Sequence, residues 1–242
     1  MSISKNDLKK FSSLKRKTKR KELGAFIVEG IKNCKELIKS DFQVIKIFIT
    51  EKDLLIHFPN GILVSENDAS RITHLKSHSS AIAIAKIPKN RISTKLDKPI
   101  LFLDNIKDPG NFGTIIRTLD WFGYSQLFCS LNCVDAYNSK TVMASMGSVF
   151  RINIHYLNFL ELIEKFPNYV TYGTFLEGDS IYKINIENES IIVMGNESIG
   201  ISKEIESIMN KKIYIPGKGK AESLNVSTAS AIILSEINKS EI

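Results

Sequence analysis

Polar side chains in the second half of the chain have the types needed to orient a hydroxyl group and to stabilise charge. They lie in three segments, each running from an apolar stretch through a polar or glycine-rich turn into helix-compatible sequence; the segments span residues 103–123, 192–202 and 213–231. In parallel α/β sheets, ligands bind beyond the carboxyl ends of the strands. The three segments therefore predict one ligand site built from three strand-to-helix loops.

The first segment contains a turn signal, Asp108-Pro109-Gly110-Asn111. Proline fixes φ and glycine tolerates positive φ, so this sequence predicts a turn before a helix near residues 114–122. Arg117 lies about one turn into that helix, and its guanidinium can reach back over the loop. An ordinary loop whose arginine faces water fits equally well, so both interpretations stay open.

The other two segments carry a glutamate, a serine and an asparagine. Gly195 ends an apolar strand, where the absence of a side chain allows a ligand to approach the backbone. Glu197 either orients a hydroxyl or amine or is simply a helix-start carboxylate. Ser223 and Asn225 are good N-cap residues, so they either cap a helix or also serve the site.

Several classes of protein are excluded by composition and motifs. A chain of 242 residues with 43% hydrophobic and 24% charged residues is neither disordered nor fibrous. No phosphate-binding P-loop and no dinucleotide-binding G-x-G-x-x-G is present. The four histidines and three cysteines lack metal-ligand spacing, so we expect no metal site and no disulfide framework. With no apolar run of membrane-spanning length and no signal peptide, we expect a soluble, cytoplasmic protein without a membrane partner.

Charge is distributed unevenly along the chain. Residues 1–98 carry 21 Lys and Arg against 10 Asp and Glu, whereas residues 99–242 carry 12 against 16. The excess is densest at residues 5–22, where apolar residues at three-residue spacing predict one basic helix. Such a surface attracts RNA by releasing counterions, although a solvated helix or a weak membrane contact remains open. The candidate RNA-binding residues are Lys15, Arg16, Lys19 and Arg20.

Both halves alternate predicted helices and strands, which indicates an α/β protein. In the first half we expect strands at 25–28, 44–50, 62–64 and 81–87, and helices at 31–38 and after Ser65. In the second half we expect strands at 100–103, 126–129, 169–175, 191–194 and 213–215, and helices at 114–122, 140–148, 159–165, 203–209 and 226–237. Strands that are apolar throughout predict a parallel sheet covered on both faces. The boundaries predicted are an RNA-binding domain at 1–90, a linker at 91–98 and a second domain at 99–242.

The three loops together resemble the motifs of the SpoU (TrmH-like) RNA ribose 2′-O-methyltransferases of the SPOUT superfamily. The matching residues read D-N-x-x-D-P-G-N-x-G-T-I-I-R-T, then M-G-N-E-x-x-G-I-S, then I-P-G followed by E-S-L-N-V-S-T-A. The first half is similar to the small, ribosomal-protein-like substrate domain of many members, mainly through Val28-Glu29-Gly30. The resemblance implies a deep trefoil knot in the parallel sheet, a homodimer, and S-adenosylmethionine as methyl donor.

The resemblance also implies roles for particular residues. Four residues match cofactor-contacting positions: Thr174, Gly195, Ile215 and Leu224. Five match catalytic or substrate-orienting positions: Asn111, Arg117, Glu197, Ser223 and Asn225. Since a guanidinium stays protonated, we hypothesise that Arg117 stabilises the developing alkoxide while Ser223 relays the proton. The chain departs from the family at Gly217, where methionine is common, and at Ser80-Ala81, where many members have glutamine and glycine.

The expected activity is methyl transfer to a ribose 2′-hydroxyl of RNA, with ribosomal RNA favoured by the two-domain layout. Within the same class, a transfer-RNA enzyme or a methyltransferase conferring antibiotic resistance remains open. From a different class, the chain could be a catalytically idle RNA-binding factor for ribosome assembly. The retained polar residues of the three motifs favour an enzyme, because an idle site would have no need of them.

Overall fold

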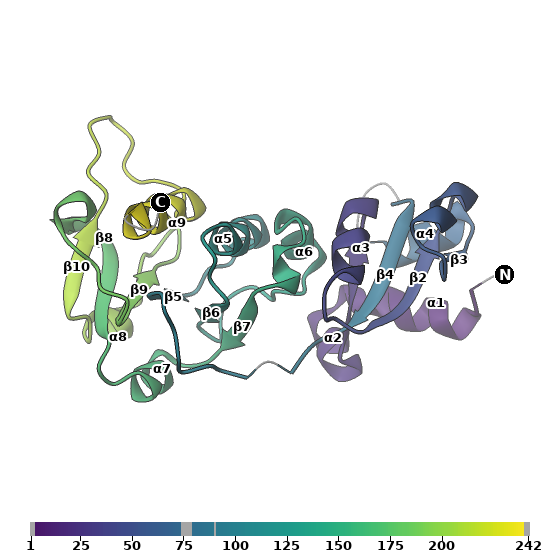
Figure 1. Cartoon of the computed structure of the whole chain (residues 1–242), viewed down its shortest axis with the longest axis horizontal. Helices are drawn as coiled ribbons and strands as arrows, with labels where there is room; N and C mark the ends of the chain where they lie inside the picture. The colour runs from purple at the N-terminus through teal and green to yellow at the C-terminus, as the bar shows by residue number, and fades with distance from the viewer. Residues whose placement is uncertain (1–2, 74–78, 90, 240–242) are drawn as a thin grey trace. The chain divides into compact units, whose positions relative to one another are not determined.

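The computed structural model describes residues 3–73, 79–89 and 91–239, and the chain divides into two compact units. The first unit contains residues 1–89 and 135–151, and the second contains residues 90–134 and 152–242. Each unit has its own sheet with helices packed around it (Figure 1). The segment 135–151 thus groups with the first unit, although the sequence predicts it within the second domain.

The first unit is built on a four-stranded sheet in the order β1-β4-β2-β3, comprising β1 (Ala25–Glu29), β4 (Ala81–Lys86), β2 (Val44–Ile49) and β3 (Ile62–Leu63). Strand β4 is antiparallel to β1 and β2, while β3 is parallel to β2. The α-helices are α1 (Lys5–Ser12), α2 (Lys17–Leu23), α3 (Ile31–Ile38), α4 (Glu66–Ile72) and α6 (Ser139–Ala144). Short 3-10 turns lie at Ser13–Lys15, Lys52–Ile56 and Ser148–Phe150. The strands and α3 follow the prediction closely, and Ser65 caps α4 by accepting a hydrogen bond from Asp68 N–H.

The basic segment is not one helix, so that prediction is wrong. Its apolar residues Leu8, Phe11 and Leu14 are buried against the sheet as predicted. The helix breaks after them because the hydroxyls of Ser12 and Ser13 donate to backbone carbonyls one turn back, at 3.1 and 2.6 Å. Arg16 then has an extended backbone before α2 begins.

The second unit is built on a six-stranded, fully parallel sheet in the order β10-β8-β9-β5-β6-β7. Its strands are β5 (Ile100–Leu103), β6 (Gln126–Cys129), β7 (Asn153–Tyr156), β8 (Val170–Ser180), β9 (Ser190–Met194) and β10 (Lys211–Tyr214). Its α-helices are α5 (Pro109–Trp121), α7 (Phe159–Lys165), α8 (Lys203–Glu206) and α9 (Val226–Ile237), with a 3-10 turn at Ile181–Lys183. Helices α5 and α9 lie side by side on one face of the sheet, and α7 and α8 lie on the other (Figure 1). The predicted parallel sheet with two covered faces is confirmed, while the trefoil knot stays a prediction.

Helix α5 and strand β7 of this unit, and helix α6 of the first unit, differ from the prediction. Helix α5 begins at Pro109, five residues before the predicted start, because Asp108 is its N-cap and accepts a hydrogen bond from Asn111 N–H at 2.8 Å. Strand β7 was not predicted, since its four residues alternate polar and apolar side chains weakly. Helix α6 ends at Ala144 rather than at Ser148, before Gly147 adopts a left-handed conformation with φ of 99°.

The predicted linker, residues 91–98, contains no helix or strand among its described residues. It is nevertheless held to the second unit. The side-chain amide of Gln126 makes two hydrogen bonds with the backbone of Ser93, at 2.9 and 3.0 Å. The predicted domain boundaries themselves stay a prediction.

Candidate active site

Hydrogen bonds between side chains join the three predicted loops beyond the carboxyl ends of β5, β9 and β10. Asn111, in the first turn of α5, donates from Nδ2 to Glu197 Oε1 at 2.7 Å. Asn225, the N-cap of α9, donates from Nδ2 to Asn111 Oδ1 at 2.9 Å. The parallel sheet brings these loops to one edge, so residues 114 positions apart form a single continuous chain of polar contacts.

The loop after β5 is fixed by groups that the sequence analysis did not single out. Asp104 is buried, and its Oδ2 accepts a hydrogen bond from Ser202 N–H at 2.8 Å, which ties the first loop to the second. Asn105 has a left-handed backbone with φ of 61°, and its N–H donates to Ser130 Oγ. Ile106 N–H donates to Cys133 Sγ at 3.2 Å. Asp104 and Asn105 open the first of the three motifs in the sequence, but the motif alone did not indicate that they hold the loop in place.

The two cysteines near this loop are buried and free. Burial raises the pKa of the Cys129 thiol well above its usual value. For Cys133 the hydrogen bond from Cys129 lowers the pKa, helped by the hydroxyl of Ser130 and by backbone N–H donors. Cys133 therefore serves as a hydrogen-bonding support for the loop.

The loop after β9 folds tightly on itself. A Cβ at Gly195 would lie 2.3 Å from Gly200 C and from Ile201 N, so only glycine fits there. The sequence analysis expected a ligand to approach the backbone of Gly195. In the structure, the backbone of Gly200 and Ile201 occupies the space beside it. Asn196 Nδ2 donates to Asn105 O at 2.9 Å, and its Oδ1 accepts the N–H of Ser198, which holds the turn carrying Glu197.

The loop between β10 and α9 is open. Residues 216–224 are exposed, and none of them makes a backbone hydrogen bond with another described residue. Leu224, at the end of the loop, is 48% exposed although it is apolar, and Ile215, just before the loop, is partly buried. Such a loop offers unpaired peptide groups and apolar side chains to a ligand.

Two predicted site residues stand apart from the polar chain. Arg117 on α5 and Ser223 in the open loop are both exposed, and neither has a hydrogen bond or ion pair with a described residue. Thr174 on β8 is half-buried, and its hydroxyl donates to Val193 O at 2.9 Å, so that donor is already in use. The structure thus joins Asn111, Glu197 and Asn225 and leaves Arg117 and Ser223 free to meet a substrate.

The predicted RNA-binding residues lie in the first unit, around the break between α1 and α2. A groove of about 770 Å³ is lined there by five cationic residues: Lys9, Lys10, Lys15, Arg16 and Lys19. Arg20 does not contribute to this surface, so its assignment to RNA is wrong. Arg20 is 3% exposed; its Nε and Nη2 donate to Asp135 Oδ2 at 2.8 and 2.6 Å, and its Nη1 donates to the carbonyls of Leu14 and Lys15.

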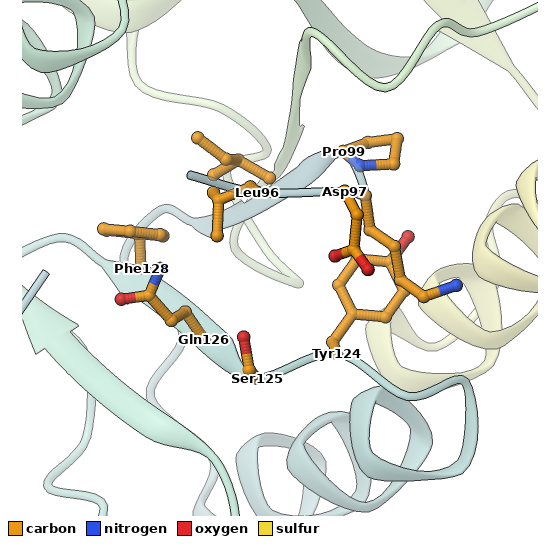
Figure 2. A pocket seen from close by; sticks show the side chains of 9 residues that line it. Leu96, Asp97, Pro99, Tyr124, Ser125, Gln126 and Phe128 are labelled. Carbon is orange, nitrogen blue, oxygen red and sulfur yellow. The ribbon is translucent and has the colours of Figure 1, made fainter. Parts of the chain in front are cut away.

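A second hollow lies at the opposite edge of the parallel sheet, where β5 and β6 begin. It is lined by residues such as Asp97, Tyr124 and Gln126 (Figure 2). Its volume of about 10 Å³ has room for roughly one water molecule. This hollow is therefore too small to hold a nucleoside cofactor.

The histidines lie away from the three loops where they are described. His57 is exposed, and His155 is buried on β7, where its ring stacks on Phe128 and burial lowers its pKa. His74 and His78 lie outside the described residues. Among the described residues, no group of three or more His, Cys, Asp or Glu side chains is arranged to hold a metal ion. Within the same ranges, no helix is both long and apolar enough to cross a membrane.

Comparison with known proteins agrees with this geometry. The model of the SpoU rRNA methylase family matches residues 98–235, and that of the MRM3-like substrate binding domain matches residues 5–88. A curated relative, the 23S rRNA (guanosine(2553)-2′-O)-methyltransferase RlmP of Bacillus subtilis, is 29% identical over 234 residues, which is 94% of each chain.

Two solved structures are similar over nearly their whole length. A putative RNA methyltransferase of the TrmH family from Porphyromonas gingivalis has a TM-score of 0.87 at 30% identity, covering 98% of this chain and 99% of that one. The AdoMet-bound rRNA methyltransferase from Sinorhizobium meliloti has a TM-score of 0.87 at 26% identity, covering 100% of this chain and 98% of that one. With the three motif loops assembled at one sheet edge and a family model that spans more than half of its length, the chain belongs to the SpoU rRNA methylase family.

Proposed function

We propose that this protein transfers a methyl group from S-adenosylmethionine to a ribose 2′-hydroxyl of ribosomal RNA. The observation that carries the proposal is the hydrogen-bonded chain from Asn225 through Asn111 to Glu197, because it assembles three distant motifs into one polar site. The relative from Bacillus subtilis, which aligns with 94% of this chain, is named for this reaction on 23S rRNA, and its name supports ribosomal over transfer RNA.

The open loop fits the proposed methyl donor. S-Adenosylmethionine presents an adenine ring, polar edges and a charged amino-acid end. The unpaired peptide groups of residues 216–224 suit those polar edges, and Ile215 and Leu224 suit the ring. Gly195 would contribute through its backbone, and Thr174 through its position, since its hydroxyl is bonded to Val193 O. When bound, the sulfonium supplies an already activated methyl group.

The residues of this chain then have to align the ribose hydroxyl and help remove its proton. Holding the reacting groups in line can supply up to about 7–11 kcal/mol of the barrier. A ribose hydroxyl is a poor nucleophile at neutral pH and needs charge stabilisation or a proton acceptor. We assign charge stabilisation of the developing alkoxide, and contact with an RNA phosphate, to the exposed guanidinium of Arg117. We assign relay of the 2′-hydroxyl proton to Ser223, whose exposed hydroxyl can pass its own proton to solvent water, while Asn111, Glu197 and Asn225 orient the substrate.

RNA binding is assigned to the cationic groove of the first unit. The groove lies within the region matched by the MRM3-like substrate binding domain, and its charges suit a phosphate backbone. We retain Lys15, Arg16 and Lys19 as RNA-binding residues and omit Arg20. The proposed domains are residues 1–90 for substrate binding, 91–98 as linker and 99–242 for methyl transfer.

We propose that the active form is a homodimer acting in the cytoplasm. Large apolar side chains are exposed on the second unit, with Trp121 at 84% and Ile199 at 67%, and a partner subunit would cover them. Three free, buried cysteines are compatible with a reducing compartment.

Two measurements test the proposal against its alternatives. Titration of the purified chain with S-adenosylmethionine should give saturable heat, whereas an idle RNA-binding factor should give none. Mapping of 2′-O-methyl groups in cells with and without this gene should show the loss of one ribosomal site. Loss of a transfer-RNA methyl group instead, with ribosomal RNA unchanged, would assign the other substrate.

A further inference from the structure

Ser227 lies in the first turn of α9, beside the polar chain, and none of the motif-based roles includes it. Its Oγ donates to Asn225 Oδ1 at 2.6 Å, and its backbone N–H donates to the same oxygen at 2.9 Å. Two donors therefore converge on one end of the Asn225 amide. Because that end can only accept, the other end, Nδ2, is directed to Asn111.

The orientation of the Asn225 amide fixes which groups donate and which accept along the hydrogen bonds from Asn225 through Asn111 to Glu197. Asn225 Nδ2 donates to Asn111 Oδ1, which leaves Asn111 Nδ2 to donate to Glu197 Oε1. If the Asn225 amide turned by 180°, its Oδ1 would face Asn111 Oδ1, and neither oxygen can donate. If the Asn111 amide then turned as well, its Oδ1 would face the carboxylate of Glu197, which also can only accept. Either arrangement would replace a hydrogen bond by two facing acceptors. The observed orientation of the two amides is therefore strongly preferred.

The far end of the chain is held independently of Ser227. Asn196 fixes the turn that carries Glu197, by donating to Asn105 O and by accepting from the N–H groups of Ser198 and Ile199. Glu197 Oε1 is occupied by Asn111, whereas Oε2 has only a 3.4 Å contact with Asn196 Nδ2. Oε2 therefore keeps capacity to accept a hydrogen bond from a bound substrate.

We infer that Ser227 is a positioning residue: its hydroxyl reinforces its backbone N–H in fixing the donor-to-acceptor direction of the Asn225–Asn111–Glu197 hydrogen bonds, and thereby the orientation of the substrate-facing groups. This inference rests on the proposed function, because that function places the three chain members in the active site. Ser227 acts through Asn225, whose Oδ1 accepts both its backbone N–H and its hydroxyl.

The test compares Ser227→Ala with Ser227→Thr and with Ser235→Ala, which removes an exposed hydroxyl near the other end of the same helix. Loss of one hydrogen bond predicts that Ser227→Ala lowers kcat by about threefold to tenfold. The KM for RNA and the calorimetric affinity for S-adenosylmethionine should not change, because binding groups are untouched. Ser227→Thr should retain most of kcat, and Ser235→Ala all of it.

A double-mutant comparison shows whether Ser227 works through Asn225. In an Asn225→Ala background, Ser227→Ala should cause no further loss of kcat, since the amide it orients is gone. An equal loss in both backgrounds, full kcat for Ser227→Ala, or a Thr variant that folds but is as slow as the Ala variant would each overturn the inference. A wild-type chain that transfers no methyl group to ribose would instead overturn the proposed function.

Discussion

Arg117 is the residue on which the proposed charge stabilisation depends. Its exposed guanidinium can form two parallel hydrogen bonds with a phosphate or alkoxide, which a lysine ammonium cannot reproduce. We predict that Arg117→Lys lowers kcat on the order of 10²-fold, the usual cost of losing a transition-state donor. Single-turnover methylation assays at saturating RNA measure this. Near-normal turnover of the lysine variant would contradict the assigned role, and Arg71→Lys on α4 is the matched control.

Arg20 illustrates a residue whose role depends on a distant partner. Removing its side chain would leave the Asp135 carboxylate, which is only 14% exposed, without its cationic partner. We predict that Arg20→Ala lowers the free energy of unfolding by about 3 kcal/mol, as for other broken buried ion pairs. The neighbouring Lys19→Ala should lower it by less than about 0.5 kcal/mol, because Lys19 pairs with Glu22 at the surface. Urea unfolding measures both; similar values for the two variants would show that the Arg20 pair is not structural.

At the scale of single residues, the sequence identified the members of the polar chain but not what surrounds them. Asn111, Glu197 and Asn225 were identified through the resemblance to the SpoU motifs, and the rule that parallel strands end at one edge predicted that their loops meet. Arg20 was misassigned because a charge run does not reveal which of its members meets a carboxylate 115 residues away. Ser227 could not be recognised either, since its role depends on an amide two residues before it.

At the scale of elements, the turn after β9 has no room for a side chain at Gly195. The backbone of Gly200 and Ile201 occupies the space that a side chain at Gly195 would need. We predict that Gly195→Ala displaces this turn, lowers the unfolding free energy by about 2 kcal/mol and abolishes saturable S-adenosylmethionine binding. Gly217→Ala is the control for stability, because nothing lies within 4 Å of a Cβ there. Equal melting temperatures for the two variants, or normal affinity of the Gly195→Ala variant for S-adenosylmethionine, would contradict this account of the turn.

Element boundaries were predictable where apolar periodicity dominates and not where side chains compete with it. Helix α9 was predicted to the residue, since its apolar stripe and its cap agree. The break between α1 and α2 was missed because two serine hydroxyls bond to the helix backbone. The early start of α5 was missed because the proline and glycine read as a turn, whereas Asp108 makes them the first turn of a helix.

At the scale of the whole molecule, the cationic groove predicts that the affinity for RNA falls as the salt concentration rises. We predict that the combined variant Lys15→Glu, Arg16→Glu and Lys19→Glu binds RNA more weakly. Its plot of log affinity against log salt should be shallower by about three. Three reversals at Lys32 and Lys35 on α3 and at its C-cap Lys39 change the net charge equally and serve as the control. Equal slopes for the two triple variants would move the RNA-binding surface away from the groove.

The fold class was predictable from alternation, but the arrangement of the chain was not. The five predicted apolar strands separated by helices indicate a parallel sheet, yet the strand order, with β8 between β10 and β9, depends on long-range packing. Likewise, nothing in the sequence of residues 135–151 shows that they pack with the first unit. Buried contacts such as those between Phe26 and Tyr137, with ring centroids 4.5 Å apart, decide that placement.

The most direct test of the proposed reaction is to locate the transferred methyl group. The purified chain is incubated with S-adenosylmethionine carrying an isotopically labelled methyl group and with ribosomal RNA from cells that lack the gene. The RNA is then digested and its nucleosides are analysed by mass spectrometry. We predict that the label is found on the ribose of one nucleoside as a 2′-O-methyl group. Label on a base, or saturable binding of the methyl donor with no transfer to any RNA, would contradict the proposal.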